Sequence, residues 1–172
     1  MVVKCFSIIL VAIFCNSCVY PSYKFRKNAD GEPILDSDSY TFNEDLTVED
    51  FIVIDTTSYY IETFQGLDSN DGQRANPRIY KFLKDGYYKE DSYLYFRKFD
   101  KERNKKSVYY GGKYKLDNNI IFMESFYPIS GGKTNRYSKI ISKGIIKNDT
   151  IYIDFFGTPH KFVKKNYNQI FK

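Results

Sequence analysis

Most of the chain alternates between apolar and polar residues with the period of a β-strand. Residues with turn propensity interrupt the alternation, most clearly at Asp85-Gly86, Asp117-Asn118-Asn119 and Asn148-Asp149. Successive hairpins of this kind form an antiparallel meander, and closing the sheet hides its edges. We therefore expect an all-β fold in which eight to ten strands form a closed or nearly closed barrel. The expected strands are 51–55, 59–64, 78–83, 87–99 (with a break near 90–91), 108–116, 120–127, 137–147, 150–156 and 160–165.

The first eighteen residues differ from the rest of the chain. Lys4 precedes the apolar run Phe6–Phe14, which is too short to span a bilayer and ends at Cys15-Asn16-Ser17-Cys18. This arrangement resembles a bacterial lipoprotein signal peptide, in which a small residue precedes the acylated cysteine. The resemblance implies that residues 1–17 are removed and that Cys18 carries a lipid anchor to the membrane. Ordinary cleavage and an uncleaved anchor are the alternatives.

The chain after the signal peptide divides into two parts. Polar and acidic residues without an apolar period predict a tether over 18–46, although a short helix could follow Thr47. Residues 47–172 then form a single barrel domain. Residues 19–24 lack the acidic residues that surface-export signals of Bacteroidetes lipoproteins place after the cysteine. We therefore expect an outer-membrane lipoprotein that faces the periplasm.

Composition supports strands held together by packing. The chain has 17 Tyr and 15 Phe but no Trp, and aromatic residues favour strands. All three Cys lie at or before position 18, so the domain has no thiol for a disulfide. The net charge is +5, and its densest cluster, between Arg97 and Lys106, fits a solvated turn, with a phosphate or lipid-headgroup patch as the alternative. We expect no nucleic-acid partner.

The order of hairpins resembles a known family. An aromatic strand, Lys84-Asp85-Gly86, an aromatic return, the run Gly112–Ile121 and a late hairpin are similar to the lipocalin-like barrels of Bacteroidetes envelope lipoproteins. The resemblance covers residues 51–165 and implies a cup with one open mouth. The Trp that typical lipocalins carry on their first strand is missing here. Another antiparallel barrel and a β-sandwich are the alternatives.

Residues that could support catalysis are scarce. His160 is the only histidine, and it has no second histidine or cysteine with which to bind a metal. Asp68, Asn70 and Gly72 resemble a calcium loop, but the glycine comes one position early and Ile79 replaces the bidentate glutamate. We therefore expect no catalytic residues, no metal and no cofactor, and the protein is not expected to be an enzyme.

Four charged residues share a strand face with bulky apolar residues. Alternation groups Glu124 with Phe122 and Phe126, and Arg97 with Tyr95; Asp154 and Glu62 have similar neighbours. Such faces point inward, where a charge must be paired or must meet a ligand. The alternative is that these charges face water. The candidate ligand-binding residues are Arg97, Glu124, Tyr95, Phe122 and Phe126.

Two functions fit these features. In the first, the barrel binds a small apolar or amphipathic ligand in a cavity of roughly 300 Å³ or more, with Arg97 or Glu124 in its wall. In the second, Tyr and Phe side chains fill the barrel, and the protein is a structural or interaction lipoprotein with an envelope protein partner.

Overall fold

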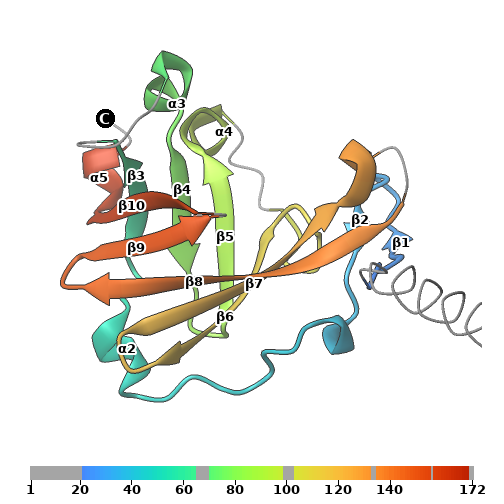
Figure 1. Cartoon of the computed structure of the whole chain (residues 1–172), viewed down its shortest axis with the longest axis horizontal. Coiled ribbons are helices and arrows are strands. Elements are labelled where there is room, and N and C mark those ends of the chain that lie inside the picture. Colours follow the sequence, from blue (N-terminus) through green and yellow to red (C-terminus); the bar gives the residue numbers. More distant parts are fainter. Residues whose placement is uncertain (1–20, 65–69, 99–102, 133–134, 156, 171–172) are drawn as a thin grey trace, which may run out of the picture.

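Eight strands form a closed antiparallel barrel (Figure 1). The computed structural model describes residues 21–172 except 65–69, 99–102, 133–134, 156 and 171–172. The expected signal peptide and Cys18 thus lie outside the described residues. The barrel strands are β3 (Tyr59–Thr63), β4 (Arg78–Phe82), β5 (Tyr87–Ser92), β6 (Gly111–Asp117), β7 (Ile120–Pro128), β8 (Tyr137–Lys147), β9 (Thr150–Phe155) and β10 (Thr158–Lys165).

Strand order follows the sequence around the barrel. Each strand from β3 to β10 pairs with the next, and β10 returns to pair with β3, where Phe162 lies opposite Glu62. The prediction of an all-β antiparallel meander closed into a lipocalin-like barrel is confirmed.

Asparagines with positive φ lie in two of the tight turns between barrel strands. Asn118 between β6 and β7 has φ 55°, and Asn148 between β8 and β9 has φ 53°. Two-residue hairpin loops need this left-handed backbone, which asparagine adopts more readily than most residues. The predicted turns at both places are therefore confirmed, with their physical cause.

Replacing Asn148 tests this cause. Asn148→Ala should lower the free energy of unfolding by about 1 kcal/mol relative to Asn148→Gly, since alanine is strained at positive φ and glycine is not. Urea unfolding of the two variants measures the difference. Equal stability of the two variants would show that the turn does not depend on the left-handed conformation.

Aromatic side chains fill the centre of the barrel and the end nearest to residues 50–53, which we call the closed end. Tyr80, Phe82, Tyr88, Tyr114 and Phe162 are all fully buried in one cluster. Their rings meet edge-on or tilted, for example Phe82 and Tyr114 at 5.0 Å and Tyr80 and Phe162 at 4.7 Å. Most of the described interior is therefore packed with the chain's own side chains.

A short helix, α2 (Asp50–Val53), covers the closed end (Figure 1). The Thr47 amide and hydroxyl donate to the Asp50 carboxylate at 2.7 and 3.0 Å, which stabilises the first turn. Val53 packs against the barrel core, and Ile54 is buried in it. The predicted strand at 51–55 is wrong, because these apolar residues close the barrel end as a helical turn.

The predicted strand 87–99 stops at Ser92 and continues as α4 (Tyr93–Lys98). The pairing of β5 with β6 ends at Lys89 opposite Gly111, and its pairing with β4 ends at Ser92 opposite Arg78, so the chain beyond Ser92 leaves the sheet. Instead the Tyr93 amide donates to the Pro77 carbonyl, and the Leu94 amide donates to the Asn76 side chain. The other short helices are α3 (Asp71–Ala75), α5 (Tyr167–Ile170), η1 (Ser37–Ser39) and η2 (Ile129–Gly132).

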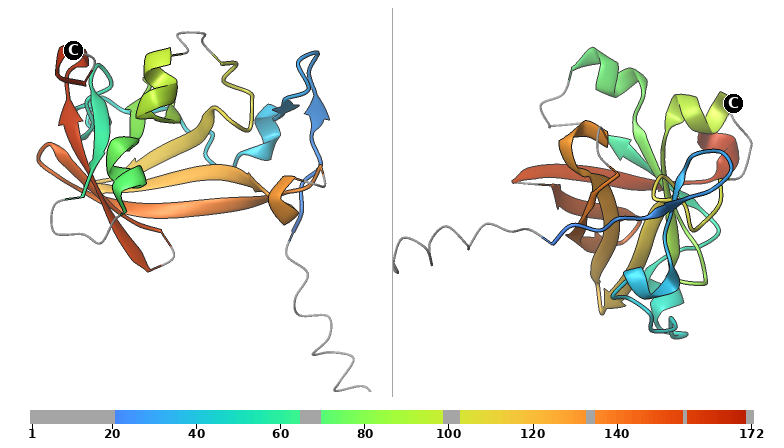
Figure 2. Two further views of the ribbon diagram at one scale, coloured as in Figure 1. Left: turned by 90° about the horizontal axis from the view of Figure 1, so that it is seen from above. Right: turned by 90° about the vertical axis from the view of Figure 1, so that its right-hand side faces the viewer.

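The N-terminal segment, residues 21–49, packs against the outside of the barrel (Figures 1 and 2). It contains the two-stranded sheet of β1 (Arg26–Lys27) and β2 (Pro33–Ile34). Its buried side chains Phe25, Leu35 and Tyr40 form an outer core with Val108, Phe126 and Tyr137 of the barrel domain. The expectation of a tether through residue 46 is wrong for the described residues, since apolar contacts hold this segment to β7 and β8.

Candidate functional site

Charged side chains gather inside the open half of the barrel. Register places Glu62 and Arg78 on the same face as the buried Tyr60 and Tyr80, and Glu90 lies opposite Tyr80. His160 shares its face with the buried Phe162. We call Glu62, Arg78, Glu90 and His160 the charged cluster. It lies at the end of the barrel that carries α3 and α4, away from α2 (Figures 1 and 2).

Arg78 is the centre of the charged cluster. Its Nε and Nη2 donate to the two Glu62 oxygens at 3.2 and 3.0 Å, and its Nη1 lies 3.9 Å from Glu90. The guanidinium also lies over the Phe155 ring, 4.7 Å from its centroid. A bidentate pair with aromatic cover fixes the orientation of this side chain.

His160 Nδ1 has two competing neighbours. It is 2.6 Å from Glu62 Oε1 and 2.8 Å from Arg78 Nη2. A protonated Nδ1 donates to Glu62, and an unprotonated Nδ1 accepts from Arg78, so one tautomer satisfies only one contact. The imidazole thus joins β10 to β3 when Nδ1 carries a proton, and to β4 when it does not.

The two carboxylates of the cluster differ in their pKa. Burial opposes ionisation of Glu62, but the hydrogen bonds and charge of Arg78 outweigh it, and His160 adds a further bond, so the pKa of Glu62 is lowered. Burial raises the pKa of Glu90, and the more distant Arg78 charge compensates it only in part. Burial also raises the pKa of the adjacent Asp91.

These opposite shifts predict a stability maximum in mildly acidic solution. Where the folded pKa is lowered from 4.5, as for Glu62, the stabilisation is present above pH 4.5 and is lost as the pH falls through the folded pKa. Where it is raised from 4.5, as for Glu90, the stabilisation is present below pH 4.5 and is lost as the pH rises through the folded pKa. Urea unfolding from about pH 3 to about pH 7 measures the loss of stability on both sides of the maximum.

Single variants separate the contributions of Glu62 and Glu90 to this pH dependence of stability. Glu62→Gln should flatten the loss of stability at low pH, and Glu90→Gln should flatten the loss at higher pH. A Glu90→Gln profile that keeps the wild-type decline above pH 4.5 would contradict the assignment to Glu90.

A pocket of about 260 Å³ opens beside the charged cluster, where β5 and β6 diverge. Glu90 and Ser125 reach it from the barrel interior, and Arg103 lines it from the loop before β6. We call it the mouth pocket. Its lining residues are Glu90, Asp91, Arg103, Val108, Tyr109, Gly111, Ser125, Phe126, Tyr127 and Pro128.

A larger hollow of about 480 Å³ lies at the opposite end, between α2 and the β8–β9 turn. Its cation is already neutralised, because Lys164 Nζ lies 2.6 Å from Asp149 and 3.8 Å from Asp55. The mouth pocket is the better candidate because it adjoins half-buried charges whose compensation is incomplete.

Glu124 lies on the outer face of β7, whereas the sequence pattern placed it inside. Its side chain is fully buried, because the N-terminal segment covers it. The Thr41 and Phe42 amides donate to its carboxylate at 2.8 to 3.0 Å, and Lys139 Nζ lies 2.7 Å away. Burial opposes its ionisation, but these bonds, led by Lys139, outweigh it and lower the pKa of Glu124. Glu124 thus holds the N-terminal segment.

The other predicted binding residues also lie away from the interior. Phe122 is on the outer face of β7, with Lys115 and Lys143 over its ring. Phe126 is on the same face, within the outer core, and it contributes to the mouth pocket. Of the predicted ligand-binding residues whose side chains are described, Phe126 is the one that lines the mouth pocket.

Tyr95 and Arg97, which the sequence pattern placed on a strand, belong instead to the helix α4. Tyr95 is 41% exposed on this helix, where its hydroxyl accepts a hydrogen bond from Arg103. Arg97 belongs to the same helix, and its side chain lies outside the described residues. Asp154 faces outward on β9. Of the four charged residues expected inside, Glu62 is the one that the described structure places there.

Sequence reasoning missed Arg78 and Glu90 and gave His160 no role in a site. The sequence did contain a signal for this site. Arg78 falls on the same strand face as Tyr80 and Phe82, and Glu90 falls on the same face as Tyr88. An apolar alternation that continues into a charge at a strand end indicates a barrel mouth.

The described ranges contain no group of three or more His, Cys, Asp or Glu side chains that could hold a metal ion. Within the same part of the chain, no helix has the length and apolar character needed to cross a membrane. Comparison with known proteins found no matching family model, no matching curated protein and no matching solved structure.

Proposed function

We propose that this protein is a lipid-anchored envelope protein whose barrel mouth binds a small amphipathic ligand. The observation that carries the proposal is the half-buried charged cluster beside an open pocket. Charges inside a barrel lower stability unless they are fully paired, and an apolar interior would be more stable. A binding role accounts for the presence of Glu62, Arg78 and Glu90 at the mouth.

The size of the pocket limits the ligand. Sites for drug-sized molecules usually measure about 300–1,000 Å³, and the mouth pocket measures about 260 Å³. Aromatic side chains fill the barrel below it, so the ligand sits at the rim and not deep in a cup. A single ring or a short alkyl chain with one polar group fits this space.

Amide NMR chemical shifts test the site directly. A panel of small amphipathic compounds should include members that shift the Ser125 and Tyr127 amides in a saturable way. A compound present at a hundred times its dissociation constant should also add about 2.7 kcal/mol of stability. Asn148 and Asp149, at the far end, serve as reference amides. If no compound perturbs the mouth amides selectively, ligand binding at this site is wrong.

A structural or interaction role is the second candidate, and one observation favours it. The outer face of β8 and β9 exposes Ile141, Ile145 and Tyr152, with Ile145 directly opposite Tyr152. Such an apolar row suits contact with an envelope protein partner. Tyr152→Lys should then abolish co-purification of that partner without lowering the unfolding midpoint.

The lipid anchor is proposed at Cys18. The Tyr23 amide donates to the Tyr137 carbonyl at 2.8 Å, and the Tyr137 amide donates back at 2.9 Å. Tyr23 is five residues after Cys18, and five fully extended residues span at most about 18 Å. A domain acylated at Cys18 would therefore lie close to the membrane surface.

Cys18→Ser should release the protein from membranes, because several acyl chains on one cysteine supply the affinity. Membrane fractionation after a high-salt wash, with mass spectrometry of the mature N-terminus, measures the result. Cys15→Ser is the matched control and should remain membrane-bound. Retention of Cys18→Ser in the membrane fraction would exclude Cys18 as the anchor.

A further inference from the structure

Among the described residues that line the mouth pocket, carboxylates outnumber cations. Glu90 and Asp91 line the pocket, and Arg103 is the one Lys or Arg among its described lining residues. Arg103 is already engaged, because its Nε lies 3.3 Å from the Glu32 carboxylate and its Nη1 donates to the Tyr109 carbonyl at 2.7 Å. The pocket wall therefore carries excess negative charge.

Glu90 is compensated only in part from inside the barrel, by the Arg78 charge and a hydrogen bond with Tyr80. The nearest Arg78 nitrogen is 3.9 Å away, whereas Arg78 makes two hydrogen bonds of 3.0 and 3.2 Å with Glu62. The guanidinium is thus committed to Glu62, and Glu90 keeps capacity to accept hydrogen bonds. Burial raises the pKa of Glu90, as incomplete compensation requires.

The remaining wall of the pocket is apolar or aromatic. Val108, Phe126 and Pro128 supply apolar surface, and the phenol rings of Tyr109 and Tyr127 lie beside them. Aromatic faces attract cations as well as apolar groups. A carboxylate on the ligand would be repelled by Glu90 and Asp91, whereas an ammonium group would be attracted.

We propose that the mouth pocket selects a small organic amine, whose ammonium group donates to the Glu90 carboxylate and whose apolar body lies against Phe126 and Tyr127. The inference rests on the function proposed above, since it names the ligand class of the same pocket. The cation supplies the positive charge that the pocket lacks. The volume of about 260 Å³ restricts the body to roughly one ring.

Three probes that share a phenyl ring and a two-carbon spacer test this inference. Phenethylamine carries an ammonium group, phenethyl alcohol is neutral, and phenylpropionate is anionic. Isothermal titration calorimetry with the full chain in detergent should show phenethylamine binding about tenfold or more tightly than the alcohol. Phenylpropionate should show no binding.

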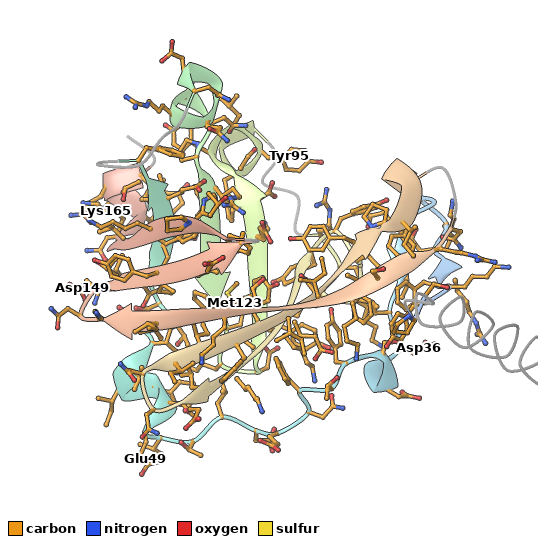
Figure 3. All side chains as sticks on the ribbon, viewed as in Figure 1. Asp36, Glu49, Tyr95, Met123, Asp149 and Lys165 are labelled. Atoms are coloured by element: carbon orange, nitrogen blue, oxygen red, sulfur yellow. The ribbon has the colours of Figure 1, made fainter. Side chains whose placement is uncertain are left out.

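Glu90→Gln should weaken phenethylamine binding about tenfold or more and leave the binding of phenethyl alcohol unchanged. Only the hydrogen bond between the ammonium group and the charged carboxylate is lost. Glu49→Gln is the matched control. Glu49 is exposed at the closed end beside α2, whereas Tyr95 is at the mouth (Figure 3), so this variant should bind like the wild type.

The outcomes separate the inference from the proposed function. If the alcohol or the carboxylate binds as tightly as the amine, or if Glu90→Gln leaves amine binding unchanged, the ligand class is wrong while binding at the mouth stands. If none of the three probes binds, the amine inference is wrong. If, in addition, no compound of the wider amphipathic panel binds at the mouth, the proposed function is wrong as well.

Discussion

Glu124→Ala should lower the free energy of unfolding by about 3–5 kcal/mol, the range expected when one partner of a buried ion pair is removed. The variant leaves the Lys139 ammonium without its carboxylate and leaves the Thr41 and Phe42 amides without their acceptor. Unsatisfied buried donors add to the cost. Urea unfolding measures the loss, and amide hydrogen exchange at Phe42 should accelerate.

Glu44→Ala is the control for this experiment. Glu44 lies in the same N-terminal segment, but its side chain is exposed, so its removal should change stability by less than about 0.5 kcal/mol. If Glu124→Ala and Glu44→Ala have similar stability, Glu124 does not hold the segment to the barrel. Faster exchange at Phe42 without a global loss would mean that the segment detaches independently.

Gly112→Ala should lower the free energy of unfolding by about 3 kcal/mol, at the upper end of overpacking effects. Gly112 lies opposite Ser125 where β6 pairs with β7, and a Cβ atom there would overlap the Glu124 carbonyl oxygen. It would also lie 3.0 Å from the Tyr88 ring. Because backbone blocks the methyl group, the two strands must separate. Thermal or urea unfolding measures the loss.

Gly72→Ala is the matched control for the glycine substitution. In α3 the added methyl group meets only the Asn70 side chain, 3.3 Å away, and alanine favours a helix. The change should stay within about 1 kcal/mol of the wild type. Equal losses for Gly112→Ala and Gly72→Ala would rule out close strand approach as the reason for Gly112.

The N-terminal segment explains why the face of β7 was misassigned. Ile121 and Met123 face the barrel core, and Glu124 and Phe126 face the N-terminal segment, so apolar residues occupy both faces of the strand. Alternation identifies a buried face only when the opposite face is exposed to water. A segment from elsewhere in the chain covers the second face, and a local pattern carries no information about it.

Helices at two predicted strands have a similar origin. The runs 51–55 and 93–99 contain apolar and aromatic residues that suit a strand as well as a helical turn. The conformation of each run depends on what lies beside it. Beside α2 lies the core at the barrel end. Beside α4 lie the Pro77 carbonyl and the Asn76 side chain, which accept hydrogen bonds from its first amides. Short apolar runs are assigned by such contacts and not by propensity.

The sequence by itself determined the meander and its turns, because a hairpin depends on a few adjacent residues. Asn118 and Asn148 adopt positive φ where the chain reverses, and alternating aromatics on either side fill the barrel. The tertiary structure alone decided which faces are covered, and it brought Glu62, Arg78, Glu90 and His160 together from four strands. Burial and charge compensation are properties of distant contacts, so they emerge only when the barrel closes.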